Sequence, residues 1–372
     1  MKSSQIKQAR AALIWSAIAE GDDFEASKLI DQYGYALALE KVLENDEDAI
    51  SKLAIRRWSN RLSIVQHESL EAYLQRGYTI VLRGSEYWPV GLDDLGERRP
   101  LSLWVRGNPK ILTQKMISIV GSRDASSEGE RVALDLAYNL AGEYLIVSGG
   151  AFGIDAQAHQ GALLANQPTV IVSAAGVDRV YPKQNSDIFE KCVEAGGAIV
   201  SESIPGAAPQ RFRFLLRNRI IATMSKAVIV VEAGARSGAL NTARQALEIG
   251  REVGAFPGSV FKPQCLGTNQ LIRNGATLVM NASQVRELIG VIGTQIADPQ
   301  MIAVEAGFTM PLVADFDSLT NRVYDSVSKV RFENTELIAK RVGVDMVTAK
   351  MKLGRLVLAG KIIEKNGKWR KV

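Results

Sequence analysis

Arginine and phenylalanine alternate in one short stretch of the sequence, RFRFLLRNR at residues 211–219. Guanidinium groups bind phosphate bidentately and aromatic rings offer faces on which bases stack, so this pairing of residue types suits single-stranded nucleic acid. The stretch follows Pro209 and is predicted to begin a helix, where the helix dipole disfavours cations. Alternatively, the arginines are merely solvated, and one of Phe212 and Phe214 belongs to the core. The candidate DNA-binding residues here are Arg211, Arg213, Phe214, Arg217, Asn218 and Arg219.

A glycine-rich loop, SGGAFGIDAQAH at residues 148–159, stands where a predicted strand gives way to a helix. Glycines let main-chain N–H groups approach an anion closely, and the dipole of the following helix favours negative charge. The loop is no Walker A motif, since no Gly-Lys-Ser/Thr follows. A plain tight connection is the alternative, with Asp155 capping the helix and His159 structural. The candidate phosphate-binding residues are Ser148, Gly149, Gly150 and Gly153.

Three further loops follow predicted strands and carry groups that suit an anion. Residues 121–123 combine a small residue, a hydroxyl and a guanidinium, although that guanidinium could instead pair with Glu128. Residues 181–183 supply a lysine, and residues 237–242 offer hydroxyls at a helix start, for a phosphate or for capping alone. The candidates in these loops are Gly121, Ser122, Arg123, Lys183, Ser237, Gly238 and Thr242.

The elements that must position these loops alternate along the chain. Short apolar runs predict strands at 79–83, 116–122, 144–150, 169–175, 198–203, 227–233, 252–258 and 276–280. Helical patterns fall at 126–142, 154–166, 185–195, 210–225, 237–249 and 266–274. The alternation predicts an α/β fold with a Rossmann-like, doubly wound, mostly parallel sheet. Ligands of such sheets bind outside the carboxyl ends of the strands, so we expect the loops to share one cleft.

Four parts are predicted along the chain: a helical accessory domain (1–76), the Rossmann-like domain (77–290), a linker (291–316) and a winged-helix-like domain (317–372). In the last, helices at 318–328, 335–342 and 345–359 precede a hairpin turn at Asn366-Gly367. From Lys329 to Val372 there are 12 Lys/Arg and four Asp/Glu, a net +8, whereas the whole chain carries +5. A secondary basic surface is predicted for duplex phosphates, with protein contact as the alternative. It comprises Lys350, Lys352, Arg355, Lys365 and Lys368.

Composition excludes several classes of protein. With 47% hydrophobic and 23% charged residues, the chain is not of a disordered type, and no apolar run reaches the roughly 18 residues of a membrane helix. Cys192 and Cys265 stand apart without a CxxC pattern or a histidine cluster, so a cytoplasmic location without disulfides or metal is expected. There are no paired carboxylates, HExxH, nucleophile elbow or Walker motif, so we expect a binding protein without cofactors rather than an enzyme.

Together the motifs resemble those of the DprA (Smf) family of DNA-processing proteins, over about residues 80–290. They are GSR (121–123), SGGAFGIDAQAH (148–159), YPKQN (181–185), SESIP (201–205), RFRFLLRNRIIA (211–222), VVEAGARSGALNTARQAL (230–247), and AFPG with LGTNQLIRNGA (to 276). The resemblance implies an extended Rossmann domain that dimerises, binds and protects incoming single-stranded DNA, and helps to load the RecA recombinase in natural transformation.

Residue by residue, the resemblance implies that Arg123 and the 148–150 loop hold phosphates, that Lys183 and Arg217 line the pocket, and that Phe214 stacks a base. Arg211 and Arg213 are additional cations that depart from the family pattern. Two alternatives remain at this point. One is a nucleotide or nucleoside-phosphate hydrolase on the same fold, although its PGGxGT loop is missing, and the other is a duplex-DNA regulator that uses the C-terminal domain.

Overall fold

The computed structural model describes residues 3–63, 68–290 and 318–372. These residues form two compact units, the larger from residues 3–63, 68–123 and 133–290 and the smaller from residues 124–132 and 318–372. The predicted linker, residues 291–316, lies outside the described residues. The four-part division of the chain stays a prediction, and each unit is described by itself below.

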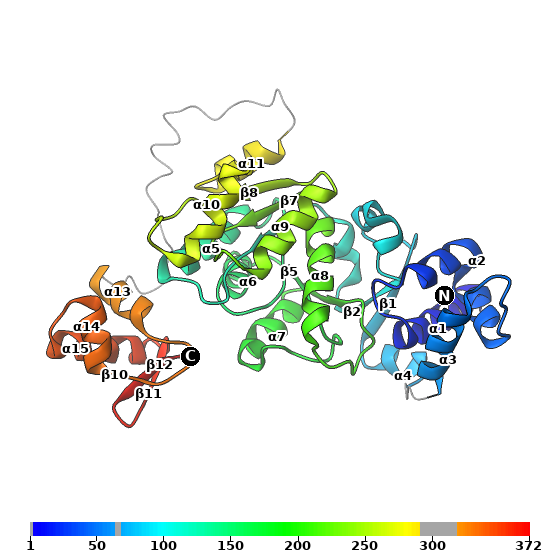
Figure 1. The fold of residues 1–372 in the computed structure, drawn as a ribbon, viewed down its shortest axis with the longest axis horizontal. Coiled ribbons are helices and arrows are strands. Elements are labelled where there is room, and N and C mark those ends of the chain that lie inside the picture. Colours follow the sequence, from blue (N-terminus) through cyan, green and yellow to red (C-terminus); the bar gives the residue numbers. More distant parts are fainter. Residues whose placement is uncertain (1–2, 64–67, 291–317) are drawn as a thin grey trace. The chain divides into compact units, whose positions relative to one another are not determined.

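Helices form the N-terminal part of the larger unit, as predicted (Figure 1). They are α1 (Ser3–Ile18), α2 (Phe24–Leu43), α3 (Lys52–Leu62) and α4 (Leu70–Gln75). Side-chain oxygens of Asp23, Ser51 and Ser69 accept from main-chain N–H groups in the first turns of α2, α3 and α4, which satisfies donors that a helix start leaves open. Trp15 and Trp58, both fully buried, pack edge to face with ring centroids 5.0 Å apart and join α1 to α3.

The sheet of the larger unit has nine strands in the order β1-β2-β6-β5-β4-β3-β7-β8-β9. The strands are β1 (Tyr78–Leu82), β2 (Ser102–Gly107), β3 (Met116–Val120), β4 (Leu145–Ser148), β5 (Thr169–Val172), β6 (Ala198–Ser201), β7 (Ala227–Val230), β8 (Glu252–Ala255) and β9 (Thr277–Leu278). From β6 to β9 all neighbours are parallel, whereas β1 and β2 pair antiparallel at one edge. The mostly parallel α/β sheet is therefore confirmed, and β2 is a strand that the sequence pattern missed.

Helices cover the sheet, and both of its faces are buried (Figure 1). The helices are α5 (Ser127–Leu140), α6 (Ile154–Leu164), α7 (Ser186–Glu194), α8 (Arg211–Met224), α9 (Gly238–Glu248), α10 (Leu266–Arg273) and α11 (Ala282–Ile289). Successive strand residues point to opposite faces, so Ile171 joins one hydrophobic cluster while its neighbours Val170 and Val172 join the other. Burial on both faces explains the continuous apolar runs in the sequence.

The strand order reverses between β3 and β7. After β3 the chain adds β4, β5 and β6 on one side and then returns to add β7, β8 and β9 on the other. At this point the two strand-end loops touch, because the Ser122 N–H donates to the Glu232 carbonyl at 2.7 Å. Such a reversal is where open α/β sheets bind ligands, beyond the carboxyl ends of the strands.

Three helices and a small antiparallel sheet make up the C-terminal part of the smaller unit. The elements are α13 (Ser318–Ser326), β10 (Glu333–Asn334), α14 (Thr335–Val342), α15 (Met346–Leu358), β11 (Ile362–Lys365) and β12 (Lys368–Lys371), with strand order β10-β12-β11. Asn366 and Gly367 have φ of 54° and 72°, as the predicted type I′ turn requires. The predicted helices and hairpin are present, and the winged-helix assignment stays a prediction.

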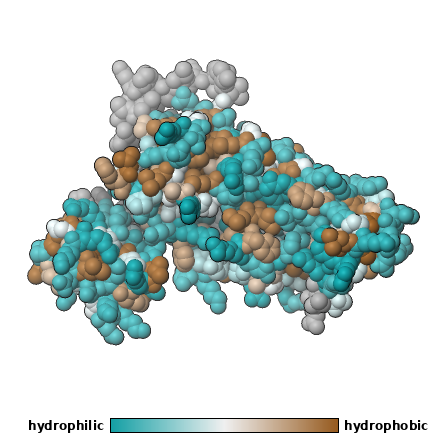
Figure 2. Space-filling model, viewed as in Figure 1, coloured by the Kyte–Doolittle hydropathy of each residue, from teal (hydrophilic) through white to brown (hydrophobic). Residues whose placement is uncertain are grey.

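Hydrophilic residues cover most of the visible face, with hydrophobic residues gathered in smaller patches between them (Figure 2). Within the described residues, no helix combines the length and the apolar character needed to cross a bilayer. Cys192 and Cys265 are both buried.

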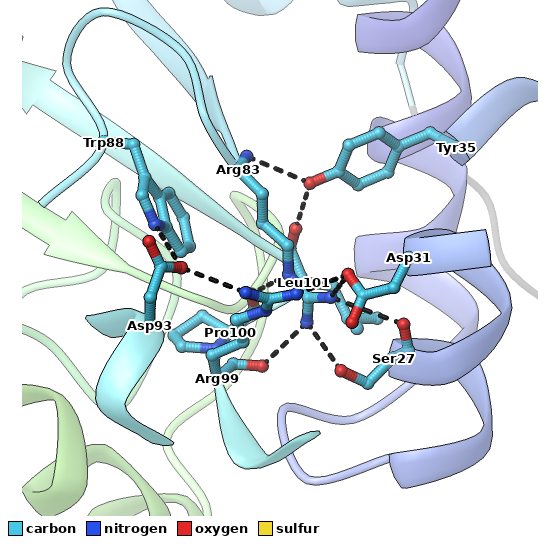
Figure 3. A network of polar contacts seen from close by, with 9 residues as sticks. All are labelled: Ser27, Asp31, Tyr35, Arg83, Trp88, Asp93, Arg99, Pro100 and Leu101. Carbon is cyan, nitrogen blue, oxygen red and sulfur yellow. Dashed lines mark hydrogen bonds and ion pairs between the residues drawn. The ribbon is translucent and has the colours of Figure 1, made fainter. Parts of the chain in front are cut away.

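An arginine whose side chain is only 8% exposed ties the N-terminal helices to the sheet (Figure 3). Arg83, the residue after β1, donates to the carbonyl oxygens of Arg99 and Pro100 at 3.0 and 2.9 Å, and to Ser27 Oγ and Asp31 Oδ1 of α2 at 2.9 Å each. Tyr35, also on α2, donates to the Leu101 carbonyl at 2.5 Å and accepts from the Arg83 N–H at 3.2 Å. Burial raises the pKa of the Tyr35 phenol.

We expect Arg83→Ala to lower the free energy of unfolding by about 3 kcal/mol, because the substitution leaves the carbonyl oxygens of Arg99 and Pro100 without the donor that Arg83 provides. Urea unfolding followed by circular dichroism measures the change. Arg56→Ala removes an exposed arginine from α3 and is the matched control, expected to stay within about 0.5 kcal/mol of the wild type. Equal unfolding midpoints for the two variants would contradict the assignment.

Candidate nucleic-acid interface

A cation and two aromatic rings, which come from two loops and one helix, meet at the carboxyl edge of the sheet. This is the edge at which the parallel strands end. The guanidinium carbon of Arg123, in the loop after β3, lies 5.3 Å from the ring centroid of Phe214 in the first turn of α8. The rings of Phe214 and Tyr181, in the loop after β5, have centroids 5.4 Å apart. Tyr181 is 48% exposed and Phe214 is half-buried. A guanidinium stacked on a ring, beside a second ring, presents both charge and stacking faces.

Two more exposed cations belong to the same elements. Lys183 is exposed and stands two residues after Tyr181. Arg211 is exposed at the start of α8, three residues before Phe214, which places both side chains on one face of the helix. The first turn of α8 holds no acidic residue. We call Arg123, Tyr181, Lys183, Arg211 and Phe214 the Arg123 surface.

Arg217 lies beneath the glycine-rich loop rather than on the surface. Its guanidinium Nη1 donates to the Gly149 carbonyl at 2.9 Å and to the Val172 carbonyl of β5, and the residue is 4% exposed. A Cβ atom on Gly149 would lie 2.2 Å from that nitrogen, so glycine is required where the arginine passes. Burial lowers the pKa of Arg217 to about 10, against the opposing effect of Asp155. Arg217 therefore contacts the glycine-rich loop, but it supports the loop from the protein interior and does not line an open pocket.

The loop's own amides are partly occupied. Asp155 Oδ2 accepts from the N–H groups of Gly149 and Ala151 at 3.2 and 3.4 Å. Asn185 Nδ2 donates to the carbonyls of Gly150 and Ala151 at 3.0 and 3.1 Å. Asp155 thus binds the loop, not the start of its own helix as the capping hypothesis had it. Burial raises the pKa of Asp155, and the guanidinium of Arg217 opposes this shift.

His159 is fully buried below this loop. Its Nδ1 lies 2.8 Å from Thr169 Oγ1, whose single proton is donated to the Ile146 carbonyl at 2.7 Å. The hydroxyl oxygen must therefore accept from Nδ1–H, which makes His159 the Nδ1–H tautomer. Burial lowers the pKa of His159 to about 3. This agrees with the structural role that the sequence suggested.

Several predicted candidates have side chains that serve the fold. Ser148 is fully buried and donates to the Ile119 carbonyl at 2.7 Å. Asn218 donates to the Gly238 carbonyl and to Asn241 Oδ1, both at 3.3 Å, and is buried. Ser237 Oγ accepts from the Ala239 N–H at 3.2 Å as the cap of α9. Thr242 of α9 is buried, and its hydroxyl lies 3.5 Å from the Gly238 carbonyl.

Glycine is required by close packing or backbone conformation at three further candidates. A Cβ atom on Gly121 would lie 2.5 Å from Ile154 Cγ1 and 2.8 Å from the Glu232 carbonyl. Gly150 and Gly153 have φ of 68° and 70°, in the region that side chains disfavour.

Two arginines of α8 are engaged by acids elsewhere in the larger unit. Arg219, 1% exposed, donates to both carboxylate oxygens of Glu202 at 2.9 and 2.6 Å and to the Gly21 carbonyl at 2.6 Å. Arg213 donates to both oxygens of Glu20 at 3.2 and 3.0 Å. Acidic residues outside α8 therefore neutralise the charges of these two arginines. The two arginines in turn hold the segment between α1 and α2 against α8. Neither of them therefore belongs to the Arg123 surface.

Sequence reasoning did not select Tyr181 and Asn185, although both lie in the quoted YPKQN motif. The ring of Tyr181 next to a lysine was a usable signal, whereas nothing in the sequence shows that the amide of Asn185 reaches the glycine-rich loop. Among the described residues, no group of three or more His, Cys, Asp or Glu side chains is arranged to hold a metal ion. In the smaller unit, Lys350, Arg355, Lys365 and Lys368 are exposed and Lys352 is half-buried.

A family model described as DNA recombination-mediator protein A matches residues 79–290. The chain belongs to this family. A protein of Mycobacterium tuberculosis H37Rv, provisionally named DNA processing protein DprA, is 32% identical over 379 aligned positions that cover 97% of this chain and 94% of the relative. Protein Smf of Escherichia coli K12 is 34% identical over 313 positions, which cover 82% and 81%. The resemblance to the DprA (Smf) family is confirmed.

Solved structures of two family members match the fold. The X-ray structure of DNA processing protein A from Streptococcus pneumoniae superposes with a TM-score of 0.65 at 29% identity, covering 77% of this chain and 98% of that one. DNA processing protein A from Helicobacter pylori, studied for its single-stranded DNA binding mode, gives a TM-score of 0.51 at 28% identity, covering 56% and 94%. Both similarities confirm the α/β class predicted for this member of the family.

We expect the buried His159 to make this family member less stable in acid. Its pKa of about 3 lies below the 6.5 of a free imidazole, so below pH 6.5 the unfolded chain binds more protons than the folded one. The His159 contribution to stability is complete above pH 6.5 and is lost as the pH falls towards 3. From pH 8 to pH 5 the loss amounts to about 2 kcal/mol.

His159→Asn is the comparison variant, because an amide N–H can replace Nδ1–H towards Thr169. The difference in unfolding free energy between wild type and variant, measured by urea unfolding at each pH, should shrink by about 2 kcal/mol from pH 8 to pH 5. Taking the difference removes most of the contribution of other groups, such as Asp155, whose raised pKa acts in the opposite direction. A difference that stays constant with pH would contradict a neutral, buried His159.

Proposed function

We propose that the chain binds single-stranded DNA on the Arg123 surface. The observation that carries the proposal is the guanidinium of Arg123 over the Phe214 ring, beside Tyr181, at the carboxyl edge where the strand order reverses. Base stacking on such rings contributes roughly 1 to 3 kcal/mol per base and tolerates any sequence. Arg123, Lys183 and Arg211 supply charges for phosphates between the stacked bases. The relative from Helicobacter pylori, which binds single-stranded DNA, supports the assignment.

The glycine-rich loop acts in this proposal as a rigid floor. Its carbonyl oxygens accept hydrogen bonds from Arg217 and Asn185, and its amide N–H groups donate to Asp155. Phosphate contact therefore falls to the exposed side chains of the Arg123 surface and to the backbone of the loop after β3. Asp155 is buried and bonded to loop amides, so it supports the loop and does not serve as the base of a nucleotide hydrolase. The protein acts by binding, without cleaving bonds.

The finer role follows from family membership. We propose that the bound strand is protected and passed to the RecA recombinase during DNA uptake, by a homodimer in the cytoplasm. The support is the family itself, which mediates DNA recombination and includes DNA processing proteins of several bacteria.

We expect Arg123→Glu and Lys183→Glu each to weaken binding of a fluorescent single-stranded oligonucleotide at least ten-fold, measured by anisotropy. If the three exposed cations neutralise about three phosphates, a plot of the logarithm of the wild-type affinity against the logarithm of the salt concentration has a slope near −2. Each of the two variants should make this slope shallower. Phe214→Leu should weaken binding by roughly 1 to 3 kcal/mol and leave the slope unchanged, because it removes stacking only.

Arg56→Glu makes the same charge change on the exposed face of α3 and should bind as the wild type does. A duplex of the same sequence, tested in parallel, should bind more weakly, since its bases are not free to stack on the rings. Unchanged affinity in Arg123→Glu, or equal affinity for the two forms of DNA, would contradict the proposed site.

The role in recombination has a separate test. We expect the wild-type protein to raise the rate of ATP hydrolysis by RecA on single-stranded DNA that is already covered by a single-strand-binding protein. Arg123→Glu should lose this effect together with DNA binding. Stimulation of the same size by the variant would mean that the effect on RecA does not pass through the Arg123 surface.

A further inference from the structure

One face of α15, in the smaller unit, is apolar and open to solvent. Val347, Met351 and Leu358 are 78%, 58% and 90% exposed. With Gly354 they stand at positions i, i+4, i+7 and i+11, which align along one side of a helix. The opposite side packs into the core through Ala349, Leu353 and Leu356. We call the four aligned residues the Val347 face. Hydrophobic patches of the smaller unit are visible at the left of Figure 2.

Gly354 is the unusual member of this face. Glycine in a helix interior destabilises a helix relative to alanine, so its presence there calls for a reason. The described residues provide none: among them, no atom lies within 4 Å of a Cβ atom placed on Gly354, and Gly354 has no positive φ. A residue without a side chain in the middle of an exposed apolar row leaves a notch through which another backbone can approach closely. Close approach at small residues is how helices pack tightly against each other.

Basic side chains border the Val347 face on both sides. At 100° per residue, Lys350 falls on one side of the row and Arg355 on the other, and both are exposed. These cations belong to the secondary basic surface that the sequence suggested for duplex phosphates. Between them, however, a duplex would meet three hydrophobic side chains and a glycine, which carry no donors or acceptors for base edges. The arrangement suits a ligand with an apolar centre and an acidic rim.

We propose that the Val347 face binds an amphipathic helix of a partner protein, with its apolar side in the row and Asp or Glu side chains opposite Lys350 and Arg355. Helices that bind in this way use apolar anchors at i, i+3 or i+4, and i+7. The carboxylates add charge complementarity and orientation, since pairs at the rim of an interface steer association. This site is independent of the Arg123 surface, so failure of either proposal leaves the other standing.

The test is a selection of phage-displayed helical peptides on the full-length chain. Enriched sequences should share the apolar spacing and carry Asp or Glu at its flanks. The most enriched peptide, synthesised with a fluorescent label, should bind Met351→Glu at least ten-fold more weakly than the wild type. Lys350→Gln should weaken binding and reduce its salt dependence. Val330→Glu adds the same charge at a residue of this unit that is 87% exposed and lies outside α15, and it should bind as the wild type does.

Gly354→Ala is the most informative variant, because its two effects have opposite signs. The melting temperature should stay the same or rise, since alanine favours the helix and its Cβ atom meets open space. Peptide affinity should nevertheless fall at least five-fold, because the notch is filled. A structural role for the glycine predicts a lower melting temperature instead.

Three results would overturn the proposal. The first is that the wild type enriches no peptides, or only peptides that Met351→Glu binds equally well. The second is enrichment without any acidic preference. The third is that a 20-base-pair duplex binds the wild type but not Met351→Glu, and that the peptide does not compete with the duplex. This result would make the Val347 face a duplex-DNA surface.

Discussion

The buried guanidinium of Arg217 is the interaction on which the carboxyl edge of the sheet depends. It spans from α8 to the carbonyls of Gly149 and Val172, and so connects that helix to the ends of β4 and β5. A charge with so little exposure is stable only when hydrogen bonds and an opposite charge replace water. Asp155 supplies the opposite charge and at the same time accepts from two amides of the loop. One cation and one carboxylate therefore fix the floor above which Arg123 and Phe214 meet.

The stretch RFRFLLRNR at the start of α8 both presents side chains at the surface and anchors the helix in the core, and burial distinguishes the residues that do each. From Arg217 to Met224 every residue of α8 is buried, whereas Arg211 and Phe212 are exposed. The helix enters the core within its second turn, so only its start can meet a ligand. Arg213 and Arg219 reach Glu20 and Gly21 between α1 and α2. The N-terminal helices thus bear directly on the helix that presents Phe214, which makes them part of its support.

The sequence predicted the elements of the fold well, because strands buried on both faces leave continuous apolar runs and the helices between them leave periodic ones. It missed β2, an antiparallel strand whose run SLWVRG contains a charged residue and ends in glycine. For the candidate site, it predicted that these loops lie at one edge of the sheet, since parallel strands end at one edge. It could not separate exposed from buried arginines within RFRFLLRNR, because that depends on where α8 enters the core and on an acid, Glu20, nearly two hundred residues away in the chain.

This division of the arginines limits how the protein can hold DNA. A surface with few exposed cations gains little from counterion release, which grows with the number of phosphates neutralised. The rings must then contribute a large share of the affinity. Tyr181 packs against Phe214, and Phe214 packs in addition against the guanidinium of Arg123. Stacking on rings that are already in place costs little side-chain entropy on binding. Such a surface favours unpaired bases over a duplex, whose charge density would require more cations and whose bases are already stacked.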